Sequence, residues 1–530
     1  MTEPQLAAIR RPDTVRKTMA QDDGKMRSII RWAGLVGGPV LAALSYAVLP
    51  KDYTDSAGQL VVFTSAGRVT LGIMIWMALW WLTEAVDISV TALLPIALFP
   101  ILGAATIKAA TAPYANEYIF LFMGGFLIAL SMQRWGLDRR IALITLKLVG
   151  TKPVNMIGGF MLVTALLSAF VSNTATTAMM LPIALSVIDL VLRNKTGQTM
   201  TETAALPSAA GRNFALCLML GIAYAASIGG IATIIGTPPN AILAGFIKET
   251  YGETISFARW LMIGVPLAVV FLPITWFLLT RVLYPIRLER IEGGRELIAR
   301  EHAQLGPMKP GEWVTLIVFL LAAIAWILRT VIERYIPGVS DPGIAIIAAM
   351  LLFVIPVDLK KRTFTMNWST ATKLPWGILI LFGGGLSLAA AVTVNGVAQF
   401  IGSTVPTLQG LAETQGLRTL LLIVLVTAGV IFLTELTSNT ATTTTLLPIL
   451  AAIAVGLGLH PYLLIVPAAI AASCAFMMPV ATPPNAIVFG SGHITIAQMC
   501  KAGLWLNLIG IALVTLLAYA IIVPVLGIAL

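Results

Sequence analysis

Two distant stretches of the chain are almost the same, Val171-Ser-Asn-Thr-Ala-Thr-Thr177 and Thr437-Ser-Asn-Thr-Ala-Thr-Thr443. Two further pairs recur around them in the same order, a glycine-rich stretch upstream and a Thr-Pro-Pro-Asn stretch downstream. These pairs are Leu121-Phe-Met-Gly-Gly125 with Leu381-Phe-Gly-Gly-Gly385, and Gly236-Thr-Pro-Pro-Asn-Ala241 with Ala481-Thr-Pro-Pro-Asn-Ala486. Three matched elements in one order indicate an internal duplication.

The composition predicts an integral membrane protein. Hydrophobic residues make up 58% of the 530-residue chain and charged residues 11%, whereas a soluble domain carries about 25% charged residues. The charges gather between apolar stretches whose lengths suit a hydrocarbon core of about 30 Å. Clear examples of these stretches are Ile29–Leu49, Val69–Leu82, Ala258–Leu279, Trp313–Ile327 and Leu504–Leu526. We therefore expect an all-α polytopic fold.

The positive charges predict the orientation in the membrane. The net charge is +10, which in a soluble protein would suggest a nucleic-acid partner. Here the cations cluster before the first span, across Arg281–Lys309 and at Lys360–Arg362. Such clusters are typical of cytoplasmic loops. We therefore expect a cytoplasmic N-terminus, a plasma (inner) membrane location and no nucleic-acid partner.

The same clusters divide the chain. Residues 1–28 are polar and lack the apolar core of a signal peptide, so we expect a disordered cytoplasmic tail. Residues 29–280 should hold the leading spans and the first repeat, and residues 281–311 a cytoplasmic linker. Residues 312–530 should hold the second repeat. About three leading spans in residues 28–112 have no counterpart of equal length in the second half.

The matched motifs predict helix breaks that form a binding site. Polar residues and Pro-Pro inside an apolar span are tolerated where they line a cavity or are buried in protein. A helix that stops and restarts offers N–H groups to an anion and carbonyl oxygens to a cation. Two Ser-Asn-Thr copies could thus hold the two carboxylates of one small dianion. Because the motifs contain no Arg or Lys, burying a dianion there favours coupling to a cation.

Each motif also has a simpler reading. A lone Ser-Asn-Thr is typical of hydrogen bonding between helices, Gly-Gly of a packing surface, and Thr-Pro-Pro of a kink. Duplication in a fixed order favours a site over these readings. Glu84 and Glu435 are intramembrane carboxylates that are either functional or paired structurally, and the sequence leaves their role open.

Other function classes lack their residues. The three cysteines and three histidines are dispersed, which argues against a disulfide framework, a zinc site or a histidine relay. An intramembrane enzyme would need a nucleophile, an acid/base pair or a metal cluster, and none is apparent. We therefore expect a protein that is not an enzyme and has no organic cofactor.

After residue 28 the chain resembles the divalent anion/sodium symporters, which carry dicarboxylates, citrate or sulfate. The resemblance rests on both motif pairs and on Trp81-Leu-Thr-Glu-Ala85, Thr91-Ala-Leu-Leu-Pro95 and Thr434-Glu-Leu-Thr-Ser-Asn-Thr440. It implies a homodimer in the lipid bilayer, with two inverted repeats and about eleven transmembrane helices per protomer. It also implies an elevator-type motion and two re-entrant hairpins, near Asn116–Trp135 and Pro375–Asn395.

The resemblance also implies the site residues. The substrate contacts would be Ser172, Asn173, Thr174, Thr237, Pro238, Ser438, Asn439, Thr440, Thr482 and Pro483. The first sodium site would use Ser168, Asn173 and Gly236, and the second Thr434, Thr437, Asn439 and Ala481. The expected function is sodium-coupled uptake of C4 dicarboxylates such as succinate, fumarate or malate. The alternative is a sodium-independent exchanger for dicarboxylate, citrate or sulfate.

Overall fold

The computed structural model describes residues 11–54, 59–150, 152–193, 209–288, 290–291, 293–404 and 415–528. Within these ranges, eleven helices are long and apolar enough to cross a membrane, judged by length and composition. Four shorter apolar helices accompany them, and the strands form two small two-stranded sheets. The expected all-α polytopic membrane fold is confirmed.

The leading part of the chain packs as a helix pair with a short hairpin of strands. Helix α2 lies along α3, and β1 pairs antiparallel with β2, Tyr53 facing Val61. The elements are α2 (Arg11–Val48), β1 (Asp52–Thr54), β2 (Leu60–Val62), α3 (Ser65–Thr83), α4 (Ile88–Thr91), α5 (Leu94–Ile101), α6 (Ile107–Thr111) and the 3-10 helix η1 (Ala112–Ala115).

The first half continues to the cationic linker. Its elements are α7 (Glu117–Trp135), α8 (Leu137–Val149), α9 (Pro153–Ser168), α10 (Asn173–Arg193), α11 (Ala209–Ile231), α12 (Pro238–Tyr251), α13 (Phe257–Phe277), the π-helix η2 (Leu278–Leu283) and the linker helix α14 (Gly294–Gln304).

The second half repeats much of this order. Its elements are α15 (Pro310–Ile327), α16 (Arg329–Ile332), α17 (Asp341–Val354), β3 (Pro356–Asp358), β4 (Thr363–Phe364), α18 (Trp368–Ala371), α19 (Trp376–Val394), α20 (Val397–Ser403), α21 (Gln415–Thr434), α22 (Asn439–Gly456), α23 (Tyr462–Ala472), α24 (Pro483–Gly490), α25 (Ile496–Leu517), the π-helix η4 (Ala518–Ile522) and α26 (Val523–Leu526).

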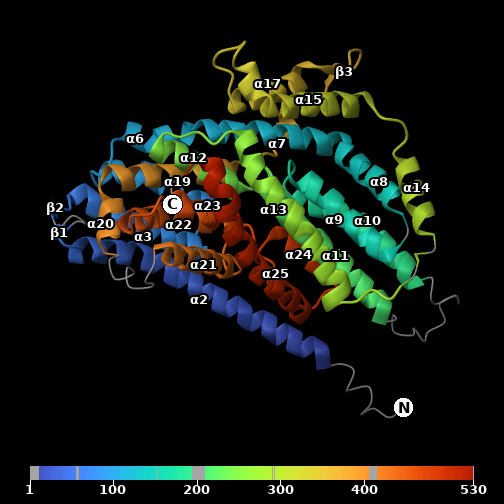
Figure 1. Ribbon diagram of the computed structural model, residues 1–530, viewed down its shortest axis with the longest axis horizontal. Coiled ribbons are helices and arrows are strands. Elements are labelled where there is room, and N and C mark those ends of the chain that lie inside the picture. The colour runs from blue at the N-terminus through green and yellow to red at the C-terminus, as the bar shows by residue number, and fades with distance from the viewer. Residues whose placement is uncertain are drawn as a thin grey trace.

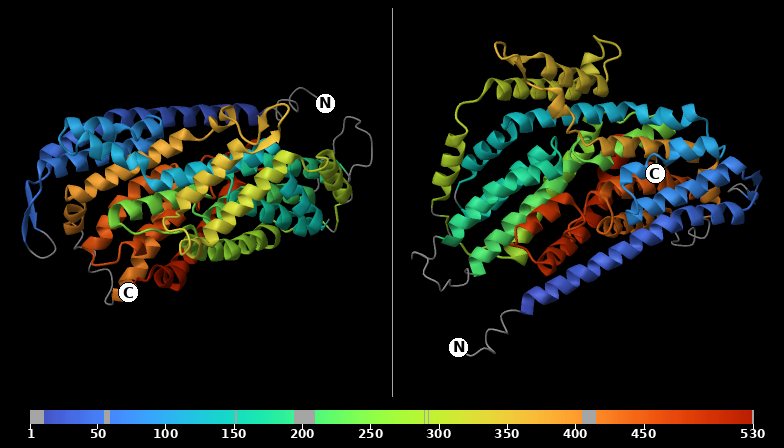
Figure 2. Two further views of the ribbon diagram at one scale, coloured as in Figure 1. Left: turned by 90° about the horizontal axis from the view of Figure 1, so that it is seen from above. Right: turned by 180° about the vertical axis from the view of Figure 1, so that it is seen from behind.

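The two halves meet in the middle of the molecule. Helix α11 contacts α9, α10 and α13 from its own half and α24 from the other, and its apolar window is entirely buried. Helix α12 likewise contacts α22 and α23. In Figure 1 these helices lie between α2 at one edge of the molecule and the pair α15 and α17 at the opposite edge. The pair α15 and α17 packs on α7. Figure 2 shows the same layering from above and from behind.

The motifs fall where one helix ends and the next begins, as the sequence predicts. Helix α9 ends at Ser168 and α10 begins at Asn173, while α21 ends at Thr434 and α22 begins at Asn439. The Thr-Pro-Pro-Asn motifs separate α11 from α12 and α23 from α24. Proline suits the first turn of a helix, where its missing N–H group would have no partner in the helix.

The predicted positions of the two hairpins are wrong. Helices α7 and α19 run without interruption through Glu117–Trp135 and Trp376–Val394, so neither range turns back on itself. Their glycines are packing surfaces instead. A Cβ atom on Gly124 would lie 2.7 Å from the Ala345 carbonyl carbon. The helix pairs that do meet at a sharp break are α9 with α10 and α21 with α22.

The N-terminal tail also differs from the prediction. Residues 1–10 lie outside the described part of the chain, but α2 begins at Arg11 and continues unbroken to Val48. The expectation of a disordered segment is therefore wrong from Arg11 onwards. The polar residues extend the first apolar helix rather than precede it.

Candidate functional site

Four helices begin at the wall of one cavity of about 870 Å³. They are α10, α12, α22 and α24, which start at the two Ser-Asn-Thr and the two Thr-Pro-Pro-Asn motifs. A helix N-terminus carries unpaired N–H groups and a partial positive charge, so each of the four favours an anion. The cavity can therefore stabilise more than one negative charge without a cationic side chain in its motifs.

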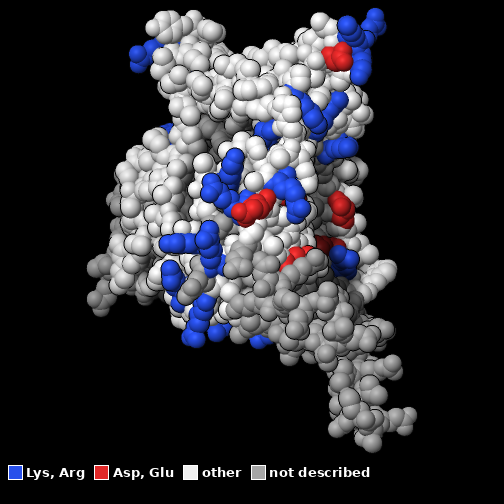
Figure 3. All heavy atoms as spheres, turned by 90° about the vertical axis from the view of Figure 1, so that its right-hand side faces the viewer, with Lys and Arg blue, Asp and Glu red and all other residues white. Residues whose placement is uncertain are grey.

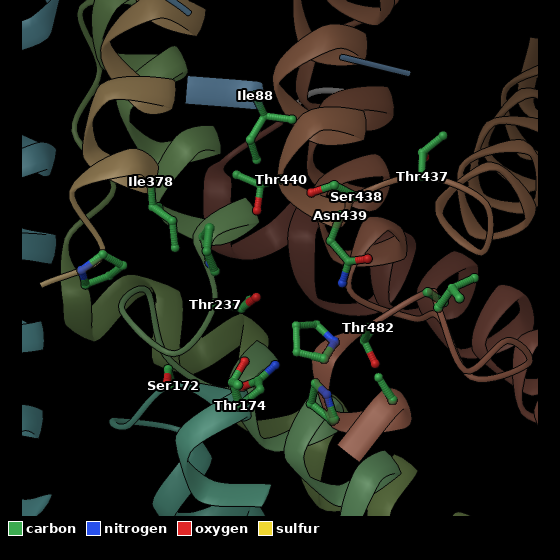
Figure 4. Close-up of a pocket in the computed structure, with 18 of the residues that line it drawn as sticks. Ile88, Ser172, Thr174, Thr237, Ile378, Thr437, Ser438, Asn439, Thr440 and Thr482 are labelled. Atoms are coloured by element: carbon green, nitrogen blue, oxygen red, sulfur yellow. The ribbon is translucent and has the colours of Figure 1, made fainter. Parts of the chain in front are cut away.

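All ten residues predicted to contact substrate line this cavity. They are Ser172, Asn173, Thr174, Thr237, Pro238, Ser438, Asn439, Thr440, Thr482 and Pro483. In Figure 4, Ser172 and Thr174 lie on one side of the pocket and Ser438 and Thr440 on the other, with Thr237 between them. The structure thus brings both halves of the duplicated sequence to one site.

The first Ser-Asn-Thr motif is anchored by a buried hydroxyl. Ser168 Oγ lies 2.6 Å from Asn173 Oδ1 and 2.8 Å from the carbonyl oxygen of Ala226. One hydroxyl hydrogen faces two acceptors, so the cluster has more lone pairs than protons. Hard cations are bound by such groups of neutral and charged oxygens.

The second motif has the same arrangement. Thr434 Oγ1 lies 2.8 Å from Asn439 Oδ1 and 3.1 Å from the carbonyl oxygen of Ala472. Ala226 and Ala472 occupy corresponding positions in the duplicated Ala-Ala-Ser segments. Ser168 and Thr434 are fully buried and stand behind the cavity wall, whereas the two asparagines line it.

The other predicted sodium ligands lie close to these clusters. Gly236, Thr437 and Ala481 line the cavity. A Cβ atom on Gly236 would come within 2.4 Å of the Gly230 carbonyl oxygen, so the backbone there is packed among carbonyls. The Thr437 hydroxyl donates to the Leu433 carbonyl oxygen at 2.9 Å and lies 2.6 Å from Thr442 Oγ1.

Two buried asparagines hold the helix breaks, and sequence reasoning missed their part. Asn240 Nδ2 donates to the carbonyls of Gly230, Ile231 and Thr233 at 3.2, 3.3 and 2.8 Å. Asn485 Nδ2 donates to the carbonyls of Ala475 and Met478 at 3.3 and 3.0 Å. The Asn240 amide bridges the end of α11 to the start of α12, and the Asn485 amide ties the segment between α23 and α24 to the start of α24. Their place in both Thr-Pro-Pro-Asn motifs was the signal that could have found them.

Glu435 supports the second break rather than lining the cavity. Its carboxylate accepts hydrogen bonds from the backbone N–H groups of Phe476, Met477 and Met478 at 2.7 to 2.9 Å, and from Asn507 Nδ2 at 2.8 Å. The side chain is buried. The question that the sequence left open for Glu435 therefore has a structural answer, because this carboxylate orders the segment that leads to Ala481.

Three charged residues line the cavity away from the motifs. Glu84 Oε2 lies 3.3 Å from Arg31 Nη2, and both residues line the cavity together with Lys373. Glu84 is the C-terminal cap of α3, Arg31 lies in α2 and Lys373 precedes α19. Glu84 is thus placed at the site, while Glu435 acts from behind it.

Comparison with known proteins identifies the family. Residues 60–527 match the family model described as the sodium:sulfate symporter transmembrane region. The chain is also 41% identical over 510 residues to the sodium-dependent dicarboxylate transporter SdcS of Staphylococcus saprophyticus, covering 96% of this chain and 94% of that one. The chain belongs to the divalent anion/sodium symporter family.

One further relative supports the family, and two solved structures support the fold. The SdcS transporter of Staphylococcus aureus is 42% identical over 504 residues, covering 93% of this chain and 92% of that one. Among solved structures, the YdaH transporter of Alcanivorax borkumensis superposes with a TM-score of 0.57 at 14% identity, over 94% of this chain and 98% of that one. MtrF of Neisseria gonorrhoeae gives 0.55 at 14% identity, over 94% and 95%. These two structures share the fold.

Proposed function

We propose that this protein imports C4 dicarboxylates such as succinate, fumarate or malate, driven by the sodium gradient across the plasma membrane. The observation that carries the proposal is the meeting of four helix N-termini at one cavity. Two of them carry a Ser-Asn-Thr motif, one for each carboxylate. The names of the two SdcS relatives, sodium-dependent dicarboxylate transporters, support both the substrate class and the ion.

The coupling ion follows from the charge balance. A dianion held by neutral donors in a partly buried site loses hydration that its partners do not fully replace. The clusters at Asn173 and Asn439 place surplus acceptor oxygens beside the cavity. Sodium ions at these two clusters would offset the two substrate charges. The proposed sodium ligands are the residues that the family resemblance implies. They are Ser168, Asn173 and Gly236 in the first site, and Thr434, Thr437, Asn439 and Ala481 in the second.

The larger motion is proposed on the resemblance. Inverted repeats, a homodimer and an elevator-type movement of the binding part against a fixed scaffold would let one cavity face each side in turn. The cytoplasmic N-terminus is proposed on charge. The linker carries five exposed arginines, Arg281, Arg287, Arg290, Arg295 and Arg300. Figure 3 shows Lys and Arg side chains concentrated on the face where α14 lies.

Uptake of radiolabelled succinate into proteoliposomes tests the proposal. Uptake driven by an inward sodium gradient should exceed uptake in choline, and two sodium ions with one dianion would make the transport electroneutral. Equal uptake in sodium and choline, together with a need for internal dicarboxylate, would favour the exchanger. The description of the family model names sulfate as the substrate. Uptake of sulfate without uptake of succinate would therefore replace the proposed substrate and leave the proposed sodium coupling in place.

A further inference from the structure

We propose that the charge at the cavity mouth, set by Arg31, Glu84 and Lys373, selects doubly charged anions, with Lys373 as the uncompensated cation. The inference rests on the proposed function, because it takes the ligand of the cavity to be a dianion. It assigns a role to three residues outside the duplicated motifs.

The charges of the cavity wall sum to one positive charge. Among the residues that line the cavity, Arg31, Glu84 and Lys373 are the charged ones. Arg31 and Glu84 form an ion pair at 3.3 Å and cancel each other. The ammonium group of Lys373 has no ion-pair or hydrogen-bond partner in the described part of the chain, and the side chain is exposed. The other described residues of the lining are neutral, so none of them offsets this charge.

Glu84 stands where local structure disfavours it. It caps α3 with a left-handed backbone, φ 47°, a region that a residue other than glycine seldom occupies. Its carboxylate also sits at a helix C-terminus, where the helix dipole favours a cation. Residues that break local rules without a packing gain concentrate at functional sites. The gain here is a negative charge placed beside Arg31 at the mouth.

A charge of this kind distinguishes ligands by their own charge. Coulomb energy scales with the ligand charge, so a dianion gains twice what a monoanion gains from Lys373. Low-dielectric walls around a cleft focus the field on its opening. Because Arg31 and Glu84 are about half exposed, at 55% and 49%, their pair is weakly held. Neutralising Glu84 should therefore add a second positive charge to the mouth.

The test uses variants that change the charge and little else. Lys373→Gln lowers the mouth charge to zero, and Glu84→Gln raises it to two. The double variant restores the wild-type value of one. Lys373→Arg keeps the charge, and Lys147→Gln removes an exposed lysine on α8 that does not line the cavity. Dissociation constants for succinate and sulfate, and for the monoanion acetate, are measured on purified protein at fixed sodium and low ionic strength. Because the energy scales with ligand charge, the fold-change for acetate should be about the square root of that for the dianions.

We expect Lys373→Gln to weaken dianion binding about threefold to fivefold, the effect of one unit charge on a dianion across about 10 Å of water. Glu84→Gln should tighten binding by a similar factor. The double variant, Lys373→Arg and Lys147→Gln should match the wild type within about twofold. Raising the ionic strength with choline chloride should shrink the differences, since screening acts on exposed charges.

Two results would overturn the inference while leaving the proposed function in place. One is wild-type affinity in Lys373→Gln. The other is a double variant that binds as weakly as Lys373→Gln, which would mean that Lys373 acts by direct contact and not by charge. Wild-type protein that binds neither dianion would contradict the proposed function itself, and the inference with it. A misfolded Lys373→Gln protein is told apart from a charge effect by the double variant, because adding Glu84→Gln to a misfolded protein would not recover the affinity.

Discussion

A hydroxyl hydrogen can satisfy one acceptor fully, and Ser168 and Thr434 each face two. The asparagine oxygen beside each hydroxyl is thus held in place without being saturated. Groups that orient a metal ligand in this way typically affect ion affinity by 10-fold to 100-fold when removed. The proposed sodium ions would lie beside these two hydroxyls.

Removing either hydroxyl should weaken the binding of sodium more than the binding of substrate. Ser168→Ala and Thr434→Ala are each expected to raise the sodium concentration for half-maximal succinate uptake by about tenfold or more. Ser168→Thr and Thr434→Ser retain a hydroxyl at the same place and serve as matched controls. Sodium titrations of uptake in proteoliposomes measure the effect, and an unchanged sodium requirement in both alanine variants would exclude these clusters as ion sites.

The sequence predicted the residues that line the cavity better than those that hold it together. Ser172, Asn173, Ser438 and Asn439 could be found because a duplicated polar motif in an apolar span has few structural uses. The contacts of Glu435 could not be found, since its partners lie about forty residues downstream in an irregular segment. Lys373 joins the cavity through the tertiary fold alone, so no local pattern indicated it.

At the scale of elements, the glycine-rich helices show why the two hairpins were misplaced. Gly-Gly permits either a turn or a close helix contact, and periodicity does not separate the two. In α7 and α19 the close contact prevails. A Cβ atom on Gly384 would lie 2.3 Å from the Ala92 carbonyl oxygen. The paired breaks at the Ser-Asn-Thr motifs were predicted correctly, because the same polar motif recurs in a fixed order in both halves.

Gly384→Ala should therefore destabilise the protein. The added methyl group meets backbone atoms that cannot rotate away, and overpacking of this kind costs about 1–3 kcal/mol. Gly429→Ala in α21 is the matched control, because nothing lies within 4 Å of its added Cβ atom and alanine favours a helix. Thermal unfolding in detergent compares the two, and equal melting temperatures would contradict the packing role of Gly384.

The backbone conformation of the segment between α23 and α24 should depend on the charge of Glu435. Glutamine offers one acceptor oxygen where the carboxylate offers two, and its NH2 group would face backbone N–H donors. Hydrogen bonds to charged groups contribute about 1.5–3 kcal/mol each, so Glu435→Gln should lower the free energy of unfolding by about 2 kcal/mol or more and reduce transport.

Glu296→Gln, on the exposed face of α14, is the control for this prediction. It removes the same charge from a site without comparable backbone contacts. Both variants are compared by thermal unfolding and by uptake at matched protein amounts. Equal stability of the two variants would mean that the carboxylate of Glu435 does not hold the break.

At the scale of the whole molecule, the charge distribution predicts which face meets the cytoplasm. Arg295 lies in the cationic linker and Tyr335 in an exposed loop between α16 and α17. One span, α15, separates the two positions. A cysteine at position 335 should react with a membrane-impermeant maleimide in intact cells, and a cysteine at position 295 should react only after the membrane is opened.

The native cysteines are replaced by serine in this experiment, although Cys217 and Cys474 are already buried. The reverse labelling pattern would invert the proposed orientation. Labelling of both positions in intact cells would mean that α15 does not cross the membrane.

The central claim is that one substrate site is built from both halves of the duplicated chain. Succinate uptake by two double variants tests it most directly, Ser172→Ala with Asn173→Ala and Ser438→Ala with Asn439→Ala. Each removes two of the polar side chains that one half contributes to the cavity and leaves apolar helices that still insert. Arg10→Ala with Arg11→Ala serves as the control and should transport normally. Both motif variants should reach the membrane in wild-type amounts and lose sodium-driven uptake. Normal uptake by either one at normal expression would show that its motif only packs helices, and would contradict a shared site.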